Sequence, residues 1–452
     1  VEGISVRIRA KVAPWRAENP CSVGGMSESE VVRIGLLGCG NVGAALVDLV
    51  NDRAAAIAQR TGITLQVVKV AVRDTARLRN IDVPVVADVN AVVDDPNVDL
   101  VVEVMGGIEP ARAAITAALG KGKPVVTANK ALLAEAGAEL FRVADVAGVD
   151  LLFEAAVAGG IPFIRPLRES LRGESIRRVM GIVNGTTNFI LTKMTEEGAD
   201  YAAVLAEAQK LGFAEADPTA DVEAFDAAAK CAVIASIAFA ADVRAGDVHR
   251  EGITSISAAD IAVARRLGYV IKLLAIAEHD ANTGELSVRV HPAMVPTTHP
   301  LASVREAYNA VFVEGDAVGS LMFYGRGAGG DPTASAVLGD VIDAAVNLKK
   351  GTHAMLGSFA RPKFTSIDET SSEYLLPLEV VDQPGVLHTI TGVFAQNGVS
   401  IRTAEQEGIG ENARLVFITH SAREAAVRQC LSDFTKLNVV KSSGAFIRVV
   451  GQ

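Results

Sequence analysis

VVRIGLLGCGNVG, residues 31–43, decides the fold of the first part of the chain. An apolar run typical of a buried strand leads directly into a glycine-rich turn, and a helical stretch follows. In such a turn Gly38 permits the tight bend, Gly40 lets a pyrophosphate approach the backbone, and Gly43 allows close packing of helix on strand. With Asn41 and Val42, these residues predict a dinucleotide site at a helix N-terminus, where backbone N–H groups receive phosphate. A glycine turn that binds no ligand is the alternative.

Strand and helix patterns alternate through residues 31–153. Further strand-like runs lie at 65–72, 99–104 and 125–128, with helical stretches among them. This alternation predicts an α/β fold with a Rossmann-type, doubly wound parallel sheet. Ligands of such sheets lie beyond the carboxyl ends of the strands, which directs Lys130 toward the nicotinamide. A lysine that merely starts a helix is an equal alternative for Lys130.

The second of these strands ends in Arg73-Asp74, where the adenosine ribose lies in this fold. An acid at this place selects NAD, and an arginine accommodates the 2′-phosphate of NADP. Because Arg73 comes first after the strand, the sequence favours NADP(H), with NAD(H) as the alternative. A solvated turn residue is the other interpretation of Arg73.

A second stretch, GFAEADPTADVEAFDAAAK at residues 212–230, gathers acids and a lysine ahead of an apolar run. Pro218 prevents a helix through the first half, so Glu215 lies on a loop. From Val222 onward the alanine-rich sequence predicts a helix, on which Asp226 and Lys230 share one face. Because the rest of that helix is apolar enough to be buried, the lysine needs a partner or a shifted pKa, as acid–base groups have. A surface Asp–Lys pair is the alternative.

Composition narrows the class of protein. The chain has 452 residues, enough for two or three domains, and its net charge of −10 argues against nucleic acid as a partner. Its four cysteines, one of them Cys231, form no CxxC motif, which fits a reducing cytoplasm. The longest apolar run, residues 231–241, is far shorter than the roughly 20 residues that span a membrane, so no membrane partner is expected. Residues 1–30 are predicted to be a poorly structured extension without a signal peptide.

Three segments together resemble the homoserine dehydrogenase family: TANKALLA at residues 127–134, the acidic stretch at 212–230, and GRGAGGDPTASAV at 325–337. The resemblance implies that Glu215 and Asp226 hold an amino-acid substrate, with Asp221 assisting at its ammonium group. It implies that Lys230 donates a proton and that Lys130 lies in the active site. Lys130, Gly212 and Gly327 then join the glycine turn and Arg73 as cofactor-binding residues.

The implied reaction is the reversible, NAD(P)H-dependent reduction of L-aspartate 4-semialdehyde to L-homoserine, on the route to threonine and methionine. Two alternatives share parts of the sequence. An aldehyde-oxidising dehydrogenase that works through a cysteine thioester would need a reactive thiol, and Cys231 is the cysteine next to Lys230. A non-enzymatic amino-acid sensor would share the C-terminal part but would have no use for the acidic loop and the lysine helix.

The segment LLFEAAVAGGI, residues 151–161, places Glu154 in an otherwise apolar strand pattern. Carboxylate and carbonyl oxygens suit a hard cation. In the family this segment binds a monovalent cation, Na⁺ or K⁺, which implies a site made by the Glu154 side chain and the carbonyls of Val157, Gly159 and Ile161. A buried, hydrogen-bonded glutamate explains the sequence equally well.

The remaining patterns divide the chain into further domains. Residues 154–321 predict an α+β catalytic and dimerisation domain, with helical segments continuing to about residue 277, and residues 322–350 return to the nucleotide domain. Residues 351–373 are a linker. Residues 374–452 predict a βαββαβ unit whose DQPGVL turn resembles an ACT domain. That resemblance implies an amino-acid effector, with threonine as the pathway end product, and the family resemblance implies a homodimer or homotetramer.

Overall fold

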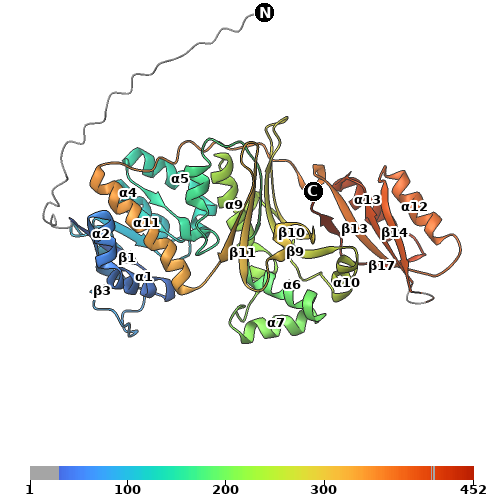
Figure 1. Cartoon of the computed structure of the whole chain (residues 1–452), viewed down its shortest axis with the longest axis horizontal. Coiled ribbons are helices and arrows are strands. Elements are labelled where there is room, and N and C mark those ends of the chain that lie inside the picture. Colours follow the sequence, from blue (N-terminus) through green and yellow to red (C-terminus); the bar gives the residue numbers. More distant parts are fainter. Residues whose placement is uncertain (1–29, 409, 411–412, 452) are drawn as a thin grey trace, which may run out of the picture.

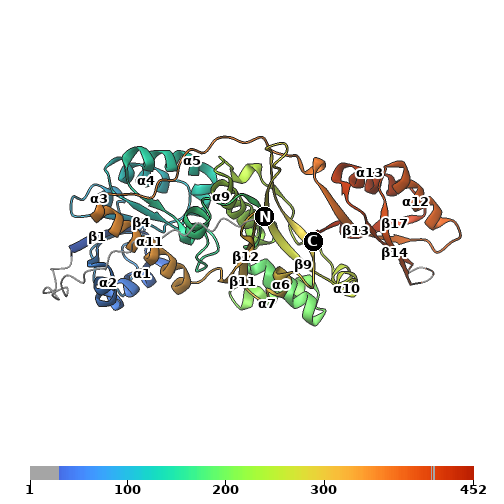
Figure 2. The same ribbon diagram turned by 45° about the horizontal axis from the view of Figure 1, so that its top comes forward.

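The computed structural model describes residues 30–408, 410 and 413–451. Three domains follow one another along the longest axis of the molecule, in chain order from the nucleotide-binding domain to the C-terminal domain (Figures 1 and 2). The predicted extension at residues 1–30 lies outside the described residues, apart from Glu30.

The first domain is a fully parallel sheet in the order β3-β2-β1-β4-β5-β6. Its strands are β1 Glu30–Leu37, β2 Ile63–Ala71, β3 Val85–Val86, β4 Leu100–Glu103, β5 Val125–Thr127 and β6 Leu151–Leu152. The connecting helices are α1 Asn41–Asp52, α2 Ala54–Thr61, α3 Asn90–Val93, α4 Ala111–Gly120 and α5 Lys130–Ala147. This strand order is that of the doubly wound dinucleotide-binding fold, which confirms the predicted fold class.

The chain comes back to this domain through α11, Gly330–Lys350, which lies beside α1 in Figure 1. The buried face of α11, which includes Val337, Leu338 and Val341, packs into the same apolar cluster as Ile34 and Leu46. The preceding strand β12, Gly319–Arg326, pairs with β11 in the second sheet. Residues 322–326, which the sequence assigned to the nucleotide domain, therefore lie in the sheet of the catalytic domain.

The second domain is built on a sheet that begins β12-β11-β7-β9-β10, with all four neighbouring pairs antiparallel. The strands are β7 Ile176–Ile182, β8 His249–Arg250, β9 Tyr269–His279, β10 Leu286–Pro296, β11 Tyr308–Gly315 and β12. The helices are α6 Gly185–Glu197, α7 Tyr201–Lys210, α8 Thr219–Val222, α9 Phe225–Phe239 and α10 Ala258–Arg266. The helix α9 packs against β7, β9 and β10, so the predicted apolar helix is indeed buried.

One secondary-structure prediction in this domain is wrong. Residues 269–277 were expected to be helical, yet Tyr269–His279 form the central strand β9. The residues of β9 are buried on both faces, because Ile271 and Leu273 join one apolar cluster while Leu274 and Ile276 join another. A strand covered on both faces loses the alternation of polar and apolar residues that reveals most strands.

The elements of the C-terminal domain follow the predicted βαββαβ order, with a two-residue strand added before the second helix and two strands in place of the last one. They are β13 Ser371–Val380, α12 Val386–Gln396, β14 Ile401–Glu407, β15 Arg414–Thr419, β16 Ala422–Arg423, α13 Glu424–Phe434, β17 Val440–Ser443 and β18 Ile447–Val449. The last strand, β18, also pairs in parallel with β10 of the catalytic domain through Ala293↔Arg448 and Met294↔Val449. The sheets of the two domains are therefore one continuous hydrogen-bonded sheet.

The segment that joins α11 to β13 is irregular, as a linker was expected to be, but it is held to both earlier domains. The Asp145 carboxylate accepts the N–H groups of Leu356 and Gly357, and Ala360 forms a bridge with Ala241. Among the described helices, none is both long and apolar enough to cross a membrane.

Candidate active site

The glycine turn after β1 has the shape that a dinucleotide requires. Gly38 has φ +95, and a Cβ placed there would lie 2.8 Å from the Val104 carbonyl oxygen. A Cβ on Gly43 would lie 2.5 Å from the Gly38 carbonyl oxygen, so neither position accepts a side chain. A Cβ on Gly40 would meet nothing within 4 Å. The open side of the turn therefore faces free space at the N-terminus of α1, which is where phosphate groups would bind.

The second glycine cluster meets this turn. A Cβ on Gly330, the first residue of α11, would lie 3.4 Å from the Asn41 carbonyl oxygen. Gly159 and Gly327 touch backbone to backbone, since a Cβ on Gly159 would lie 2.3 Å from the Gly327 carbonyl oxygen. The two glycine-rich segments, distant in sequence, thus form one backbone-lined region at the N-terminus of α1.

The adenosine end of the predicted site carries several arginines after β2. Arg73 is exposed, while the Asp74 carboxylate accepts the backbone N–H groups of Ala76 and Arg77 at 3.0 and 3.3 Å. Arg79, which the sequence analysis did not select, donates to the carbonyl of Asp74 at 2.8 Å and contacts the Cys39 carbonyl in the glycine turn at 3.4 Å. In the sequence, Arg79 could have been found only as one more basic residue in the loop after the second strand.

A buried glutamate organises the carboxyl ends of β4 and β5. The Glu103 side chain accepts the N–H groups of Met105 and Gly106 and the hydroxyl of Thr127, the last at 2.6 Å. Asn129 caps α5 by accepting the N–H of Leu132 at 3.1 Å. These contacts fix the start of α5 and so place Lys130, its first residue. The sequence analysis did not select Glu103, although an acid at the end of the apolar run LVVE indicates a buried polar contact.

Lys130 and Lys230 come together on Asp226. The Asp226 carboxylate lies 2.6 Å from Nζ of Lys230 and 3.1 Å from Nζ of Lys130. Nδ2 of Asn184 donates to Asp226 at 3.0 Å and to Asp221 at 2.6 Å. Lys230 also donates to the Val183 carbonyl at 2.7 Å. Three of the predicted residues thus form one cluster, and Asn184 links Asp221 to it.

The local backbone explains how this cluster forms. The expected continuous helix from Val222 is broken, because Ala224 adopts a left-handed conformation with φ 63 between α8 and α9. As a result Asp226 stands in the first turn of α9, where the helix dipole favours a negative charge. Burial alone would raise the pKa of Asp226, but the charges of Lys230 and Lys130 outweigh it and hold that pKa well below its usual range.

The other predicted residues of the acidic stretch lie on the loop that precedes α8. Glu215 is exposed, and within the part of the chain that the structure describes its side chain forms no hydrogen bond or ion pair. Gly212, with φ +78, is also exposed on this loop. Thr186 at the start of α6 holds the loop through the Phe213 carbonyl at 2.6 Å. The structure therefore anchors this loop beside the N-terminus of α6, which Asn184 caps.

Family models match three consecutive parts of the chain. The model described as the NAD-binding domain of homoserine dehydrogenase matches residues 38–154, that of homoserine dehydrogenase matches 162–342, and that of the ACT domain matches 374–437. A homoserine dehydrogenase from Corynebacterium glutamicum is 49% identical over 431 residues, which cover 94% of this chain and 97% of that protein. The chain belongs to the homoserine dehydrogenase family. It is accordingly an NAD(P)-dependent oxidoreductase with a C-terminal ACT domain.

Solved structures of the family have the same fold. The crystal structure of a homoserine dehydrogenase from Thiobacillus denitrificans has a TM-score of 0.88 at 39% identity and covers 93% of this chain and 98% of that one. A hyperthermophilic archaeal homoserine dehydrogenase in complex with NADPH has a TM-score of 0.60 at 29% identity. It covers 70% of this chain and 98% of that one.

The structure shows the surroundings of Glu154, whose side chain belongs to the cation site that the family resemblance implied. Glu154 starts a short 3-10 turn, Glu154–Ala156, and is not part of a strand. Its carboxylate accepts three backbone N–H groups, those of Phe163, Ile164 and Arg165. The Glu154 side chain is therefore a buried, hydrogen-bonded group, as the alternative interpretation expected, and one acceptor position of its carboxylate stays open. The cation site remains a prediction. In the described part of the chain, no three His, Cys, Asp or Glu side chains cluster as metal ligands.

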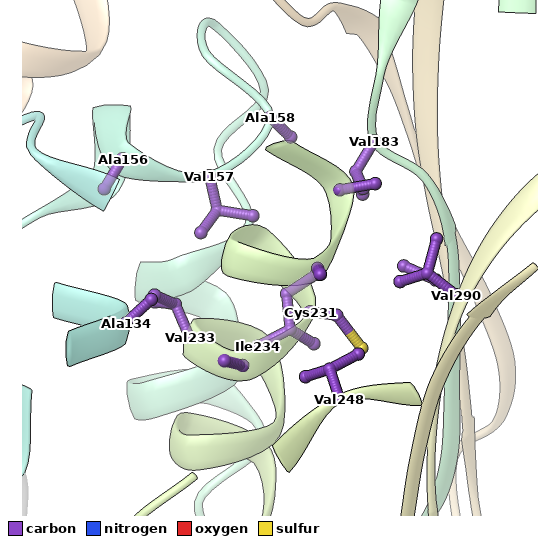
Figure 3. Close-up of a cluster of buried hydrophobic side chains, with 14 of the residues drawn as sticks. Ala134, Ala156, Val157, Ala158, Val183, Cys231, Val233, Ile234, Val248 and Val290 are labelled. Atoms are coloured by element: carbon purple, nitrogen blue, oxygen red, sulfur yellow. The ribbon is translucent and has the colours of Figure 1, made fainter. Parts of the chain in front are cut away.

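The thioester alternative is excluded by the position of Cys231. Figure 3 shows the Cys231 side chain directed from α9 toward Val248 and Val290, within an apolar cluster. Burial raises the pKa of the Cys231 thiol to about 12, so a thiolate nucleophile does not form at neutral pH. The acid–base groups available on α9 are Asp226 and Lys230.

Proposed function

We propose that the lysine–aspartate cluster reduces the aldehyde of L-aspartate 4-semialdehyde to the alcohol of L-homoserine, within the biosynthesis of threonine and methionine. The observation that carries this proposal is the convergence of Lys130 and Lys230 on Asp226 beneath the carboxyl ends of the nucleotide-binding strands. A bound nicotinamide supplies the hydride. The chain itself must bind the aldehyde, stabilise the charge that grows on its oxygen and deliver one proton.

Lys230 donates the proton to the alkoxide oxygen, and Lys130 stabilises its negative charge. Asp226, with oxygens at 2.6 and 3.1 Å from the two ammonium groups, orients both of them. Glu215 and Asp221 bind the substrate ammonium group, and Asp226 is the third carboxylate of the site. The exposed Glu215 carboxylate supports this role because none of the described residues pairs with it.

NADPH is the preferred reductant in this proposal, and NADH is the weaker one. The Asp74 carboxylate is engaged with backbone N–H groups, while Arg73 is exposed beside it. An exposed guanidinium at the end of β2 suits the 2′-phosphate of NADPH. Gly212 and Gly327 complete the cofactor site. A monovalent cation, Na⁺ or K⁺, binds the Glu154 side chain and the carbonyls of Val157, Gly159 and Ile161.

The ACT domain binds an amino-acid effector, threonine, and acts on the active site through β18. Arg448 of β18 donates to the Glu251 carboxylate at 2.7 and 2.8 Å. The neighbouring Arg250 donates to the Glu223 carbonyl at 3.3 Å, and its guanidinium lies 3.4 Å from the centre of the Phe225 ring. Phe225 directly precedes Asp226 at the start of α9. A shift of β18 therefore reaches the catalytic carboxylate through these few contacts.

The test of catalysis is NADPH consumption with aspartate semialdehyde by the purified chain, with glyceraldehyde 3-phosphate as a control aldehyde.

The test of regulation compares threonine inhibition of the full chain with that of a chain ending at Arg361, which retains the ion pair between Arg361 and Asp247. Activity that persists without threonine inhibition supports the ACT site. Threonine inhibition that survives the truncation places the effector at the active site. Light scattering tests the proposed homodimer or homotetramer, and cell fractionation tests the proposed cytoplasmic location.

A further inference from the structure

A second cavity lies in the catalytic domain, away from the lysine–aspartate cluster. It has a volume of about 330 Å³ and is lined by residues of α6, α10, β9 and the segment after β10. The lining residues that matter here are Thr192 and Glu196 of α6, Arg265 of α10, Lys272 of β9, and Arg305. The volume lies in the range of small-ligand sites, roughly 300–1,000 Å³.

A buried cation lines this cavity without a matching anion. Lys272 is only 4% exposed, and its Nζ donates to Oδ1 of Asn188 at 2.9 Å and to the Val304 carbonyl at 2.6 Å. Within residues 30–408, 410 and 413–451, no carboxylate forms an ion pair with it. An ammonium group has three donors, so one remains available. A buried charge of this kind is costly unless something compensates it.

A buried hydroxyl lines the same cavity. Oγ1 of Thr192 is inaccessible to solvent and has no hydrogen-bond partner among the residues that the structure describes. Unpaired buried polar atoms are rare in folded proteins, and a ligand group is a common reason for them. An oxygen of a carboxylate can accept hydrogen bonds from an ammonium and from a hydroxyl at the same time.

The mouth of the cavity adds a second positive charge. Nε of Arg305 pairs with Glu196 at 2.9 Å, so these two charges compensate each other. Arg265 is exposed, and among the described side chains no acid pairs with it. Two positive groups are thus left without a carboxylate partner among the described residues, Lys272 inside the cavity and Arg265 at its edge.

We propose that this cavity binds a small dicarboxylate, with one carboxylate on Lys272 and Thr192 and the other on Arg265. Glu196 would in addition meet the ammonium group of an acidic amino acid. The ligand is therefore either a plain dicarboxylic acid or an acidic amino acid, and the two share the same pair of anionic groups. The cavity adjoins the ACT domain, since its lining residue Tyr269 accepts a hydrogen bond from Arg402 of β14 at 3.0 Å.

The test is calorimetric titration of the full chain, saturated with NADPH, with succinate and with L-aspartate. Lys272→Met should weaken binding at least about tenfold, because a charge-assisted contact is lost. Thr192→Val, which is nearly isosteric and leaves the fold intact, and Arg265→Ala should each weaken binding about threefold. The matched control is Arg266→Ala, because Arg266 follows Arg265 on α10 but pairs with Glu405 at 3.0 Å. Lys230→Met should bind the probes as the unaltered chain does, which separates this cavity from the active site.

The pH dependence supplies a second readout. Burial lowers the pKa of Lys272 to about 8, with Glu196 opposing and Arg305 reinforcing the shift. Binding should therefore weaken as pH rises through about 8 in the unaltered chain and should not do so in Lys272→Met. Tighter binding of L-aspartate than of succinate identifies the amino acid, and the reverse identifies the plain acid. The proposal fails if neither probe binds at up to about 10 mM, if Thr192→Val and Arg265→Ala bind normally, or if phosphate binds as tightly as succinate.

Discussion

Replacing Lys230 with methionine removes the proposed proton donor and keeps an unbranched side chain that is one atom shorter. Nζ of Lys230 lies 2.6 Å from Asp226, and Nζ of Lys130 lies 3.1 Å from the same carboxylate. In Lys230→Met the charge of Lys130 stays in place, but no proton is delivered from α9. A positioned general acid contributes about 10²–10⁴-fold to rate. At about 1.4 kcal/mol per factor of ten, the barrier should rise by about 3–5 kcal/mol.

The same substitution should leave the fold intact. It removes one hydrogen bond to the Val183 carbonyl and one of three partners of Asp226, which keeps Lys130 and Asn184. An unsatisfied buried group costs about 1–3 kcal/mol, which is less than the total stability of a typical domain. NADPH binding should not change, since the glycine turn lies in the other domain.

The assay is single-turnover oxidation of NADPH by aspartate semialdehyde, with thermal unfolding and NADPH affinity measured on the same preparation. Lys193→Met is a matched control, because Lys193 forms an i,i+4 ion pair with Glu197 at 2.8 Å on α6 and has no place in the proposed mechanism. The control should keep its turnover. If Lys230→Met turns over within about threefold of the unaltered chain, Lys230 is not the proton donor.

Substitutions at three further positions test the cofactor site and the domain junction. Arg73→Ala should weaken NADPH binding about tenfold or more and leave NADH nearly unchanged, and equal losses would make Arg73 a structural residue. Burial opposes ionisation of Glu251, but hydrogen bonds from Arg448 outweigh it and hold its pKa well below the usual range. Glu251→Gln should therefore lower the free energy of unfolding by about 3 kcal/mol at pH 7, and the deficit should shrink as pH falls below about 4.5, as urea titrations would show. Arg250→Ala should raise KM for the semialdehyde several-fold with KM for NADPH unchanged. Arg250→Lys keeps a cation over Phe225, so its KM for the semialdehyde should be close to that of the unaltered chain.

Features that depend on residues close together in the sequence could be predicted from it. The glycine turn is one, since the shape of each position follows from the absence of a side chain at Gly38 and Gly43. The i,i+4 pair of Asp226 and Lys230 is another, because helix geometry alone brings the two side chains together. The family resemblance added Lys130, whose approach to Asp226 depends on the packing of α5 against α9.

Features that depend on residues far apart in the sequence could not be predicted. The partners of Glu154 are one example, because the three N–H groups that its carboxylate accepts belong to residues 163–165. Which partner a buried glutamate takes is decided by the fold around it. The break at Ala224 is of the same kind, because alanine favours a helix and only the surrounding packing holds it at φ 63. That break is nevertheless what puts Asp226 at a helix N-terminus.

The attachment of the C-terminal domain shows why its role could not be inferred from its own sequence. Its sequence pattern alone predicts a separate βαββαβ unit that a linker joins to the enzyme. In the folded chain, Arg448 and Glu251 are 197 residues apart in sequence and form a bidentate ion pair, and Arg448 is only 3% exposed. Glu424 of α13 binds the same guanidinium at 2.7 Å. Because removing one partner of a buried charge pair costs several kcal/mol, the position of β18 and that of the segment after β8 are energetically linked. The segment after β8 is also tied to the turn before α9, since Ile253 donates at 2.9 Å to the carbonyl of Val222, the last residue of α8. An effector that moves the ACT domain must therefore either carry the start of α9 with it or break this ion pair.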